Sequence, residues 1–368
     1  MSRRSVESLH TVCWLPWLPI CREVPIGNVV FLPFSPNDPG AVTTTSIRDL
    51  RQFARCYVDM KGKPVQQMCI ATWEKDLSFS GLTDQQVDSV FRASDLLMLG
   101  YLSTNEYFCE VGAYANATLF QTYVQRFAQG DSMVGVRTRR RDGQAYDACL
   151  RREVKTQKPV AALSCRLPTM CDDGFLKALK CVAAGSSPHH SNILDSLFFF
   201  SLANTDDQHA SLRVEAVLSQ WSVEHLLGGC EGNLQYCQKL AKVVGPWVKC
   251  RLDDTDRSAG QRPKKRLPPD PSILDHWAYE HYELRNKITH GNEWKRLDWR
   301  WTIFEHCVFA AWLYPLLVKV QLSNAKEKEY ELSDCDTACL NSIGPLLACK
   351  DWRNNWTKII QHRQSIFP

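Results

Sequence analysis

The chain has 368 residues, of which 44% are hydrophobic and 23% charged, proportions typical of a globular protein with a sizeable core. Its net charge of +4 is too small to indicate nucleic-acid binding by itself, so any basic surface must be local. The length predicts two domains, and the pattern along the chain favours an α+β fold, with a mixed N-terminal domain followed by a mainly antiparallel α-helical bundle.

The apolar runs and the cysteines indicate the compartment. The strongest membrane candidate, Cys307 to Val320, is short and contains Pro315, so it predicts a buried helix and no membrane contact. The N-terminal residues predict no signal peptide, because prolines and charges interrupt them. The 16 cysteines include no Cys-x2-Cys pair, which favours buried thiols in a reducing cytoplasm over a disulfide framework or a zinc site. The sequence therefore predicts no metal and no cofactor.

The first half of the chain gives alternating strand and helix signals after about 30 residues without periodicity. A helix of about 16 residues should follow Thr83 as its N-cap. The other expected elements are a strand at Asn28–Phe34, a helix or strand at Ile47–Val58, a strand at Gln67–Trp73, and mixed segments at Tyr107–Tyr114 and Leu119–Phe127.

Positive charge concentrates between Arg137 and Lys158. Three acidic residues there (Asp142, Asp147 and Glu153) oppose eight basic ones: Arg137, Arg139, Arg140, Arg141, Arg151, Arg152, Lys155 and Lys158. This stretch is either a surface that contacts phosphate groups or a solvated loop, and the solvated loop is the more common case for such a run.

From residue 188 the pattern becomes helical. The expected helices are Asn192–Ala203, Ser211–Leu227, Leu234–Val248 with a break at Gly245-Pro246, a helix that follows Asp270 as N-cap, and a helix from Asp298 to Val320. The last of these is apolar on several faces, so we expect it to be buried on more than one side and to bury surface in a twofold dimer. The predicted domains are residues 1–187, a helical bundle at 188–325, and a C-terminal helical extension at 326–368 in which Trp352 and Trp356 lie in a short final helix.

Three polar residues come together at the end of the helix after Asp270. Its buried stripe comprises Ile273, Trp277, Leu284 and Ile288. Arg285 lies on one flank of this stripe, while Asn286 and His290 are four residues apart on the other, and Gly291 is a typical helix terminator. Glu215 and Glu224 of an earlier helix could pack near this motif.

The arrangement Arg285-Asn286-x3-His290 resembles the catalytic motif of HEPN ribonucleases, and the flanking residues are similar to the Apea-like branch of that superfamily. The resemblance covers about residues 190–322. It implies a metal-independent endoribonuclease with Arg285, Asn286 and His290 as catalytic residues, and a homodimer in which two motifs face one RNA cleft. It also implies a bacterial antiphage-defence effector or a toxin that acts on tRNA or another host RNA. Some members have a tyrosine two residues after the histidine, where this chain has Asn292.

The chemistry fits these residue types. When the 2′-hydroxyl of RNA attacks the adjacent phosphorus, histidine can move protons near neutral pH and arginine can stabilise the developing phosphorane charge. RNA should also contact Lys287 and the loop residues that precede the motif helix: Lys264, Lys265 and Arg266. Two alternatives remain open. Arginine and histidine at a helix end can simply cap carbonyl groups, and the bundle could be a non-catalytic scaffold that binds nucleotide, RNA or a protein partner.

Overall fold

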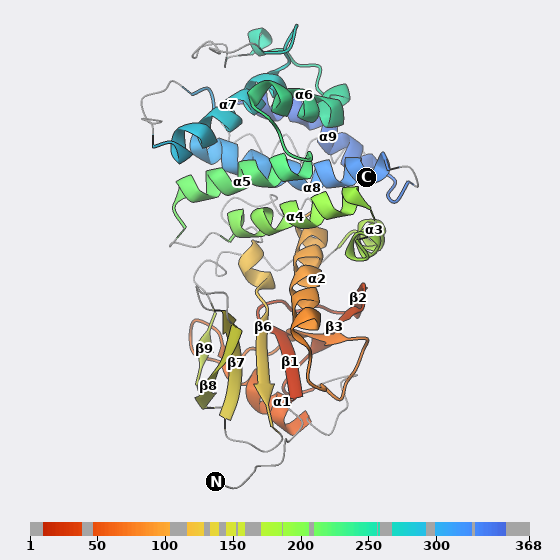
Figure 1. Cartoon of the computed structure of the whole chain (residues 1–368), viewed down its shortest axis with the longest axis vertical. Coiled ribbons are helices and arrows are strands. Elements are labelled where there is room, and N and C mark those ends of the chain that lie inside the picture. Colours follow the sequence, from red (N-terminus) through yellow and green to blue (C-terminus); the bar gives the residue numbers. More distant parts are fainter. Residues whose placement is uncertain are drawn as a thin grey trace. The chain divides into compact units, whose positions relative to one another are not determined.

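A computed structural model describes residues 10–38, 47–103, 116–128, 133–139, 145–151, 154–158, 171–185, 187–205, 210–255, 257, 267–291, 299–325 and 328–350. The chain divides into two compact units (Figure 1). The sheet unit comprises residues 1–98 and 115–170, and the helical unit comprises residues 99–114 and 171–368. The α+β class is confirmed. The helical unit begins before residue 188 and includes the described residues after 325, so its bounds differ from the three predicted domains.

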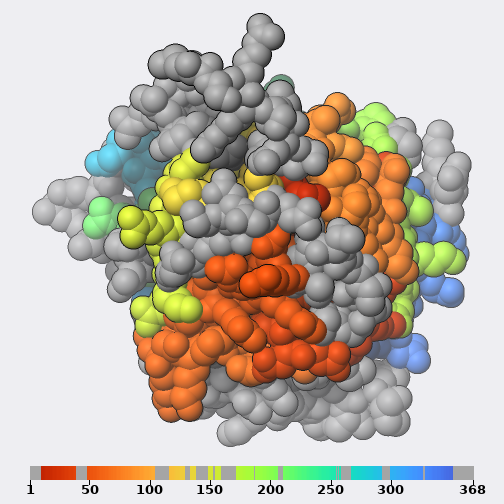
Figure 2. Space-filling view, turned by 90° about the horizontal axis from the view of Figure 1, so that it is seen from below, coloured from red at the N-terminus to blue at the C-terminus, as the bar shows by residue number. Residues whose placement is uncertain are grey.

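The sheet unit contains all the named strands and two of the α-helices. Its elements are β1 (His10–Leu15), β2 (Val24–Ile26), β3 (Val29–Phe34), α1 (Ile47–Ala54), β4 (Tyr57–Val58), β5 (Met68–Trp73), most of α2 (Asp84–Leu102), the 3-10 helix η2 (Ala117–Phe120), β6 (Tyr123–Phe127), β7 (Met133–Arg139), β8 (Ala145–Arg151) and β9 (Thr156–Gln157). Residues of this unit, coloured red to yellow, form much of the surface in Figure 2.

Seven of these strands form one antiparallel sheet in the order β2-β3-β5-β1-β6-β7-β8, and β4 pairs with β9 in parallel. Strand β1 lies between β5 and β6, and its residues Val12 to Leu15 have no exposed surface. Because both faces of β1 are covered, it lacks the alternation that identifies a half-buried strand. The absence of a periodic signal before residue 30 therefore concealed β1 and β2.

A ring contact joins α1 to the sheet, and a side-chain cap determines where α2 begins. The ring of Phe53 in α1 lies 4.6 Å from that of Phe127 in β6. The backbone N–H of Gln86 donates to Thr83 Oγ1 at 3.3 Å, which confirms Thr83 as the N-cap of α2. The predicted strands near residues 28–34 and 67–73 are confirmed, and the ambiguous segment 47–58 forms α1 and then β4. Residues 107–114 lie outside the described part.

The helical unit contains seven α-helices in its described residues. They are α3 (Asp173–Ala183), α4 (Pro188–Ala203), α5 (Leu212–Leu226), α6 (Asn233–Val244), α7 (Ile273–Thr289), α8 (Ile303–Ser323) and α9 (Asp334–Ala348), with 3-10 turns η4 (Gly245–Trp247) and η5 (Leu252–Asp254). The predicted break near Gly245-Pro246 is confirmed by the change from α6 to η4.

Helix α8 is the central helix of this unit. It packs against α4, α5 and α6, while α7 packs against α5, α6 and α9 (Figure 1). By length and composition alone α8 could cross a membrane, with a mean hydropathy of 1.4, yet 72% of that stretch is buried inside the structure. The apolar faces of α8 are therefore covered by its own chain. They no longer argue for a dimer, although Phe304 is 60% exposed.

Side-chain caps determine where the last three helices begin. Ser272, Thr302 and Ser333 each accept a hydrogen bond from the backbone N–H three residues later. The acidic side chain at that later position accepts one from the backbone N–H of the cap residue, which completes a capping box. The prediction that Asp270 caps the motif helix was wrong, because Asp270 has a positive φ of 56° and Ser272 is the cap. Helix α8 likewise begins at Ile303 and not at residue 298.

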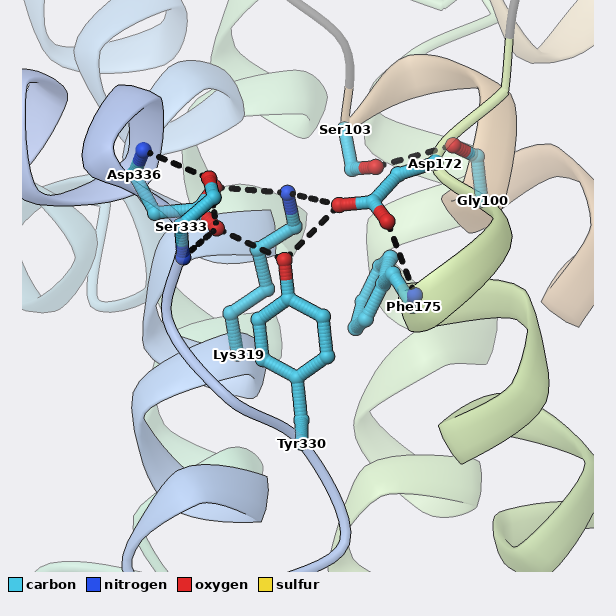
Figure 3. Close-up of polar contacts among 8 residues, drawn as sticks. All are labelled: Gly100, Ser103, Asp172, Phe175, Lys319, Tyr330, Ser333 and Asp336. Atoms are coloured by element: carbon cyan, nitrogen blue, oxygen red, sulfur yellow. Dashed lines mark hydrogen bonds and ion pairs between the residues drawn. The ribbon is translucent and has the colours of Figure 1, made fainter.

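Helix α3 was not predicted, α9 lies in the expected helical extension, and a buried polar cluster joins both to α8 (Figure 3). Lys319 of α8 is 3% exposed, and its Nζ donates to Asp172 at 3.0 Å and to Asp336 at 2.7 Å. The hydroxyl of Tyr330 lies 2.7 Å and 2.6 Å from the same two carboxylates. Asp172 also caps α3, so one ammonium group links the first turns of two helices. Tyr330 and Asp336 thus attach the segment after residue 326 to the rest of the helical unit. Trp352 and Trp356 lie outside the described residues.

Candidate active site

The end of α7 carries the three predicted catalytic residues. Three of the four residues predicted to form its buried stripe are at most 1% exposed: Ile273, Trp277 and Leu284. Ile288, the fourth, is only half-buried because the helix nears the surface there. His290 is the C-cap, and Gly291 follows with a φ of +67°, a left-handed conformation that favours glycine. The predicted end of the helix is confirmed.

The guanidinium group of Arg285 is held by side chains from two helices. Its Nε donates to Gln220 Oε1 at 3.0 Å, and its Nη2 donates to Glu224 Oε2 at 2.8 Å, both on α5. Its Nη1 donates to Asn286 Oδ1 at 2.8 Å. The guanidinium carbon also lies 4.8 Å from the ring centre of Tyr282. The structure thus brings Arg285 and Asn286 together, and places Glu224, a suggested neighbour, in direct contact with Arg285.

His290 lies on the exposed side of the same helix end. Its backbone N–H donates to Asn286 O at 3.0 Å, so the residue closes the helix through its backbone. Its imidazole is exposed and has no hydrogen bond or ion pair within the described residues. The structure therefore leaves the ring accessible, but it does not join the ring to the side chain of Arg285 or Asn286.

The carboxylate of Glu224 influences neighbouring groups. Burial, followed by the charge of Glu224, raises the pKa of the Tyr282 hydroxyl. Burial also raises the pKa of the Cys230 thiol to about 11, with a further upward contribution from Glu224. Both groups stay protonated at neutral pH, so neither is an activated nucleophile.

A buried aromatic layer supports α7 behind the motif. His281 is fully buried, and its ring nitrogens lie 3.3 Å from Ser219 Oγ and 3.1 Å from the Tyr236 hydroxyl. Its ring stacks on that of His306 at 5.5 Å. Burial lowers the pKa of His281 to about 3, and burial together with His281 lowers that of His306 well below its ordinary value. These two histidines are therefore neutral core residues.

The predicted RNA-contacting residues have different outcomes. Lys287 is half-buried in the last turn of α7, next to Asn286. Lys264, Lys265 and Arg266 lie outside the described residues.

The described part of the basic stretch that begins at Arg137 belongs to the sheet unit. Arg137, Arg139 and Arg151 lie on β7 and β8 and not in a loop, whereas Lys155 and Lys158 lie outside the named strands. Arg137 makes an ion pair of 2.7 Å with Asp84, and Lys155 Nζ donates to the Arg55 carbonyl at 2.9 Å. These two side chains are engaged within their own unit.

The sequence of α5 contains a further sign of this site, which the motif on α7 does not include. Gln220 and Glu224 are four residues apart on α5, among residues that are largely apolar, and the Gln220 Nε2 donates to Glu224 Oε2 at 2.9 Å. Such a polar pair on a buried face indicates a partner on the facing helix, here Arg285. Glu215, by contrast, lies near Cys307 of α8.

In the part of the chain described, no group of three histidine, cysteine, aspartate or glutamate side chains has an arrangement suited to a metal ion. The cysteines that the structure describes are free thiols. Comparison of the chain with protein-family models, curated proteins and solved structures found no match.

Proposed function

We propose that the helical unit is a metal-independent endoribonuclease in which Arg285, Asn286 and His290 act on an RNA phosphodiester. The observation that supports this most directly is the exposed end of α7. There a fixed cation, an amide and an accessible imidazole occupy one helical turn and a half. Proton transfer by an imidazole and charge stabilisation by a cation can catalyse transesterification of RNA without a metal.

The roles follow from the contacts. Arginine has five N–H donors, and three nitrogens of Arg285 each use one in the contacts to α5 and Asn286. The remaining donors could bind a phosphate oxygen and stabilise the negative charge that forms on it. His290 would take the proton from the 2′-hydroxyl. The new oxygen–phosphorus bond expels the 5′-oxygen, which takes up a proton, and the products carry a 2′,3′-cyclic phosphate and a 5′-hydroxyl.

One imidazole cannot serve as both base and acid at the same moment, so a second copy is part of this proposal. A homodimer would bring two motifs to one RNA cleft. Sedimentation at micromolar concentration should then give about twice the chain mass of 42.1 kDa. A monomer that still cuts RNA would remove the two-motif site from the mechanism.

The deciding experiment compares RNA cleavage by the wild type, His290→Ala and His225→Ala. His225 is an exposed histidine of α5 whose ring contacts Phe199, so it is a matched control. We expect cleavage in EDTA by the wild type and the control, with products that end in cyclic phosphate, and none by His290→Ala. Wild-type cleavage by His290→Ala, or loss of all cleavage in EDTA, would reject the assignment.

The biological part of the proposal is a cytoplasmic defence effector or toxin that acts on tRNA or another host RNA. Induced expression of the wild type should then arrest bacterial growth and fragment total RNA, whereas His290→Ala should do neither. Fragmentation without dependence on His290 would point to another site.

One observation favours the second candidate, a non-catalytic scaffold that binds nucleotide, RNA or a protein partner. The Arg285–Glu224 ion pair, with 18% and 12% of the two side chains exposed, already gives the arginine a structural partner. If Arg285→Ala destabilises the protein while no variant and no wild type cuts RNA, the scaffold is the better description.

A further inference from the structure

The helical unit contains a cavity that includes none of the proposed catalytic residues. It has a volume of about 970 Å³, within the size range of small-molecule sites. It is bordered by the first turn of α4, the ends of α5 and α8, one face of α6, and Glu329.

Two lysines of α6 face this cavity. Lys239 and Lys242 are three residues apart and therefore share a helix face. Lys239 Nζ donates to the carbonyl oxygens of Leu227 and Gly229 at 3.2 Å and 2.5 Å, so its charge is engaged by the end of α5. Lys242 is exposed and has no partner among the described residues. It is the lining cation that remains available to a ligand.

The acidic residue of the lining is already engaged. Both carboxylate oxygens of Glu329 lie within 2.9 Å of His190 Nε2. The first turn of α4 adds positive potential, because the N-terminal end of a helix carries a partial positive charge. Ser187 caps this turn by accepting from the His190 N–H at 3.2 Å. The balance around the cavity therefore favours a negatively charged group.

The rest of the lining indicates a ligand with an apolar body. Leu226, Leu227 and Val243 line the cavity from α5 and α6. Burial, followed by the neighbouring His190, lowers the pKa of His189, so this half-buried ring is neutral at pH 7. His189 Nε2 has no hydrogen-bond partner in the described structure, and a polar ligand group could supply one.

We propose that this cavity binds a small organic anion. Its ring or chain would pack against Leu226, Leu227 and Val243, and its carboxylate or phosphate group would pair with Lys242. Apolar burial supplies most of the affinity in such sites, and a few placed polar groups supply orientation. The site is independent of RNA cleavage, since Arg285, Asn286 and His290 do not line it.

Calorimetric titration of the full chain with three probes of one ring system tests this directly. 1-Naphthyl phosphate and 1-naphthoate carry the anion, and 1-naphthol lacks it. We expect at least one anion to bind about tenfold more tightly than the naphthol, a difference of about 1.4 kcal/mol. Which anion binds more tightly distinguishes a phosphate ligand from a carboxylate ligand. Inorganic phosphate should bind more weakly than naphthyl phosphate, because it cannot use the apolar walls.

Variants place the binding at this cavity. Lys242→Met should weaken the binding of the anions about tenfold and leave 1-naphthol unchanged. Lys177→Met, at an exposed lysine of α3 outside the lining, should change nothing. Val243→Trp places a much larger side chain on the apolar wall of the cavity and should weaken binding of all three naphthyl probes. Since Lys242 is exposed, its removal should not impair folding.

Three results would overturn the proposal. The first is that neither naphthyl phosphate nor naphthoate binds at millimolar concentration. Another is equal binding by wild type and Lys242→Met. The third is a loss of binding in His290→Ala but not in Lys242→Met, which would place the anion at the end of α7 instead.

Discussion

Arg285 has a structural role that its place in a catalytic motif does not predict. Removing its side chain leaves Gln220, which is fully buried, and Glu224, which is half-buried, without their partner on α7. An unpaired buried carboxylate or amide costs free energy that the original contact had offset. Loss of cleavage in an Arg285 variant would therefore need a stability control.

The first prediction concerns this stability. Arg285→Ala should lower the free energy of unfolding by about 2 kcal/mol. His290→Ala should stay within about 0.5 kcal/mol of wild type, because its exposed ring has no side-chain partner in the described residues. Urea denaturation followed by circular dichroism measures both. Equal stability of Arg285→Ala and wild type would show that the network with α5 contributes little.

The second prediction concerns the buried histidines. The folded-state pKa of His281 is lowered to about 3, and that of His306 is also far below 6.5. Between those values and 6.5 the unfolded chain binds more protons than the folded one, so stability is present above pH 6.5 and is lost as the pH falls below it. Each histidine should contribute up to about 1.4 kcal/mol per pH unit.

Urea unfolding at pH 7 and pH 5 tests this sign and its source. His306→Phe removes one of the two groups and should reduce the loss of stability between the two pH values, whereas His225→Ala should not. His306→Phe also removes two ring nitrogens that are buried and have no hydrogen-bond partner among the described residues. A pH dependence that His306→Phe leaves unchanged would mean that His306 does not titrate as described.

At the scale of elements, Lys319, Asp172, Tyr330 and Asp336 form a buried cluster that joins α3 to α8 and α9 (Figure 3). Replacing Lys319 with methionine leaves the Asp172 and Asp336 carboxylates without their cation. This third prediction is a loss of about 3 kcal/mol in unfolding free energy, the usual cost of breaking a buried ion pair from one side. Lys177→Met on the exposed face of α3 is the control and should be neutral. A neutral Lys319→Met would argue that Tyr330 and the helix caps suffice.

The ionisable groups of this cluster stabilise the fold over a defined range of pH. Burial raises the pKa of Asp172, but Lys319 and the hydrogen bonds lower it by more, so the net pKa lies below 3.8. Its contribution to stability is present above 3.8 and is lost as the pH falls through the folded pKa. For Lys319, burial lowers the pKa and the two carboxylates raise it by more, so its contribution is lost only when the pH rises above 10.5.

Long helices with a regular apolar spacing were predictable from sequence, whereas a short strand covered on both faces was not. Helices α5 and α7 follow their apolar spacing closely, and both lie where expected. Strand β1 is covered on both faces and has no alternation to detect. Helix α9 contains Gly344 and Pro345, residue types that often interrupt a helix, yet it continues from its capping box to Ala348 with buried leucines along it.

The site was predictable in part for a similar reason. Local spacing places Arg285, Asn286 and His290 on one helix end, because this depends only on the helical repeat. The contacts of Arg285 with Gln220 and Glu224 depend on how α5 packs against α7, and no local pattern encodes that packing. The apolar faces of α8 correctly indicated a buried helix. They did not indicate whether its own chain or a second copy of the protein covers it.

At the scale of the molecule, each unit has its own core and should respond separately to core mutations. Phe31 of β3 has no exposed surface, so Phe31→Ala should destabilise the sheet unit by about 4 kcal/mol. This fourth prediction holds that hydrogen exchange will then accelerate in β1, β3 and β5 but not in α7 and α8. Equal acceleration in both sets would show that the units unfold as one.

The position of β8 has a consequence for how copies of this protein behave in a crowded solution. Within the described residues β8 pairs only with β7, so its other side offers unpaired backbone groups, with Cys149 and Leu150 exposed beside them. An uncovered strand of this kind can recruit the same strand of another molecule and begin aggregation. Arg151 is exposed at its end, and like charges there would repel a second copy. Arg151→Ala should accordingly become turbid sooner on heating than Arg92→Ala, which removes an exposed arginine from α2, so the basic stretch would keep the protein soluble.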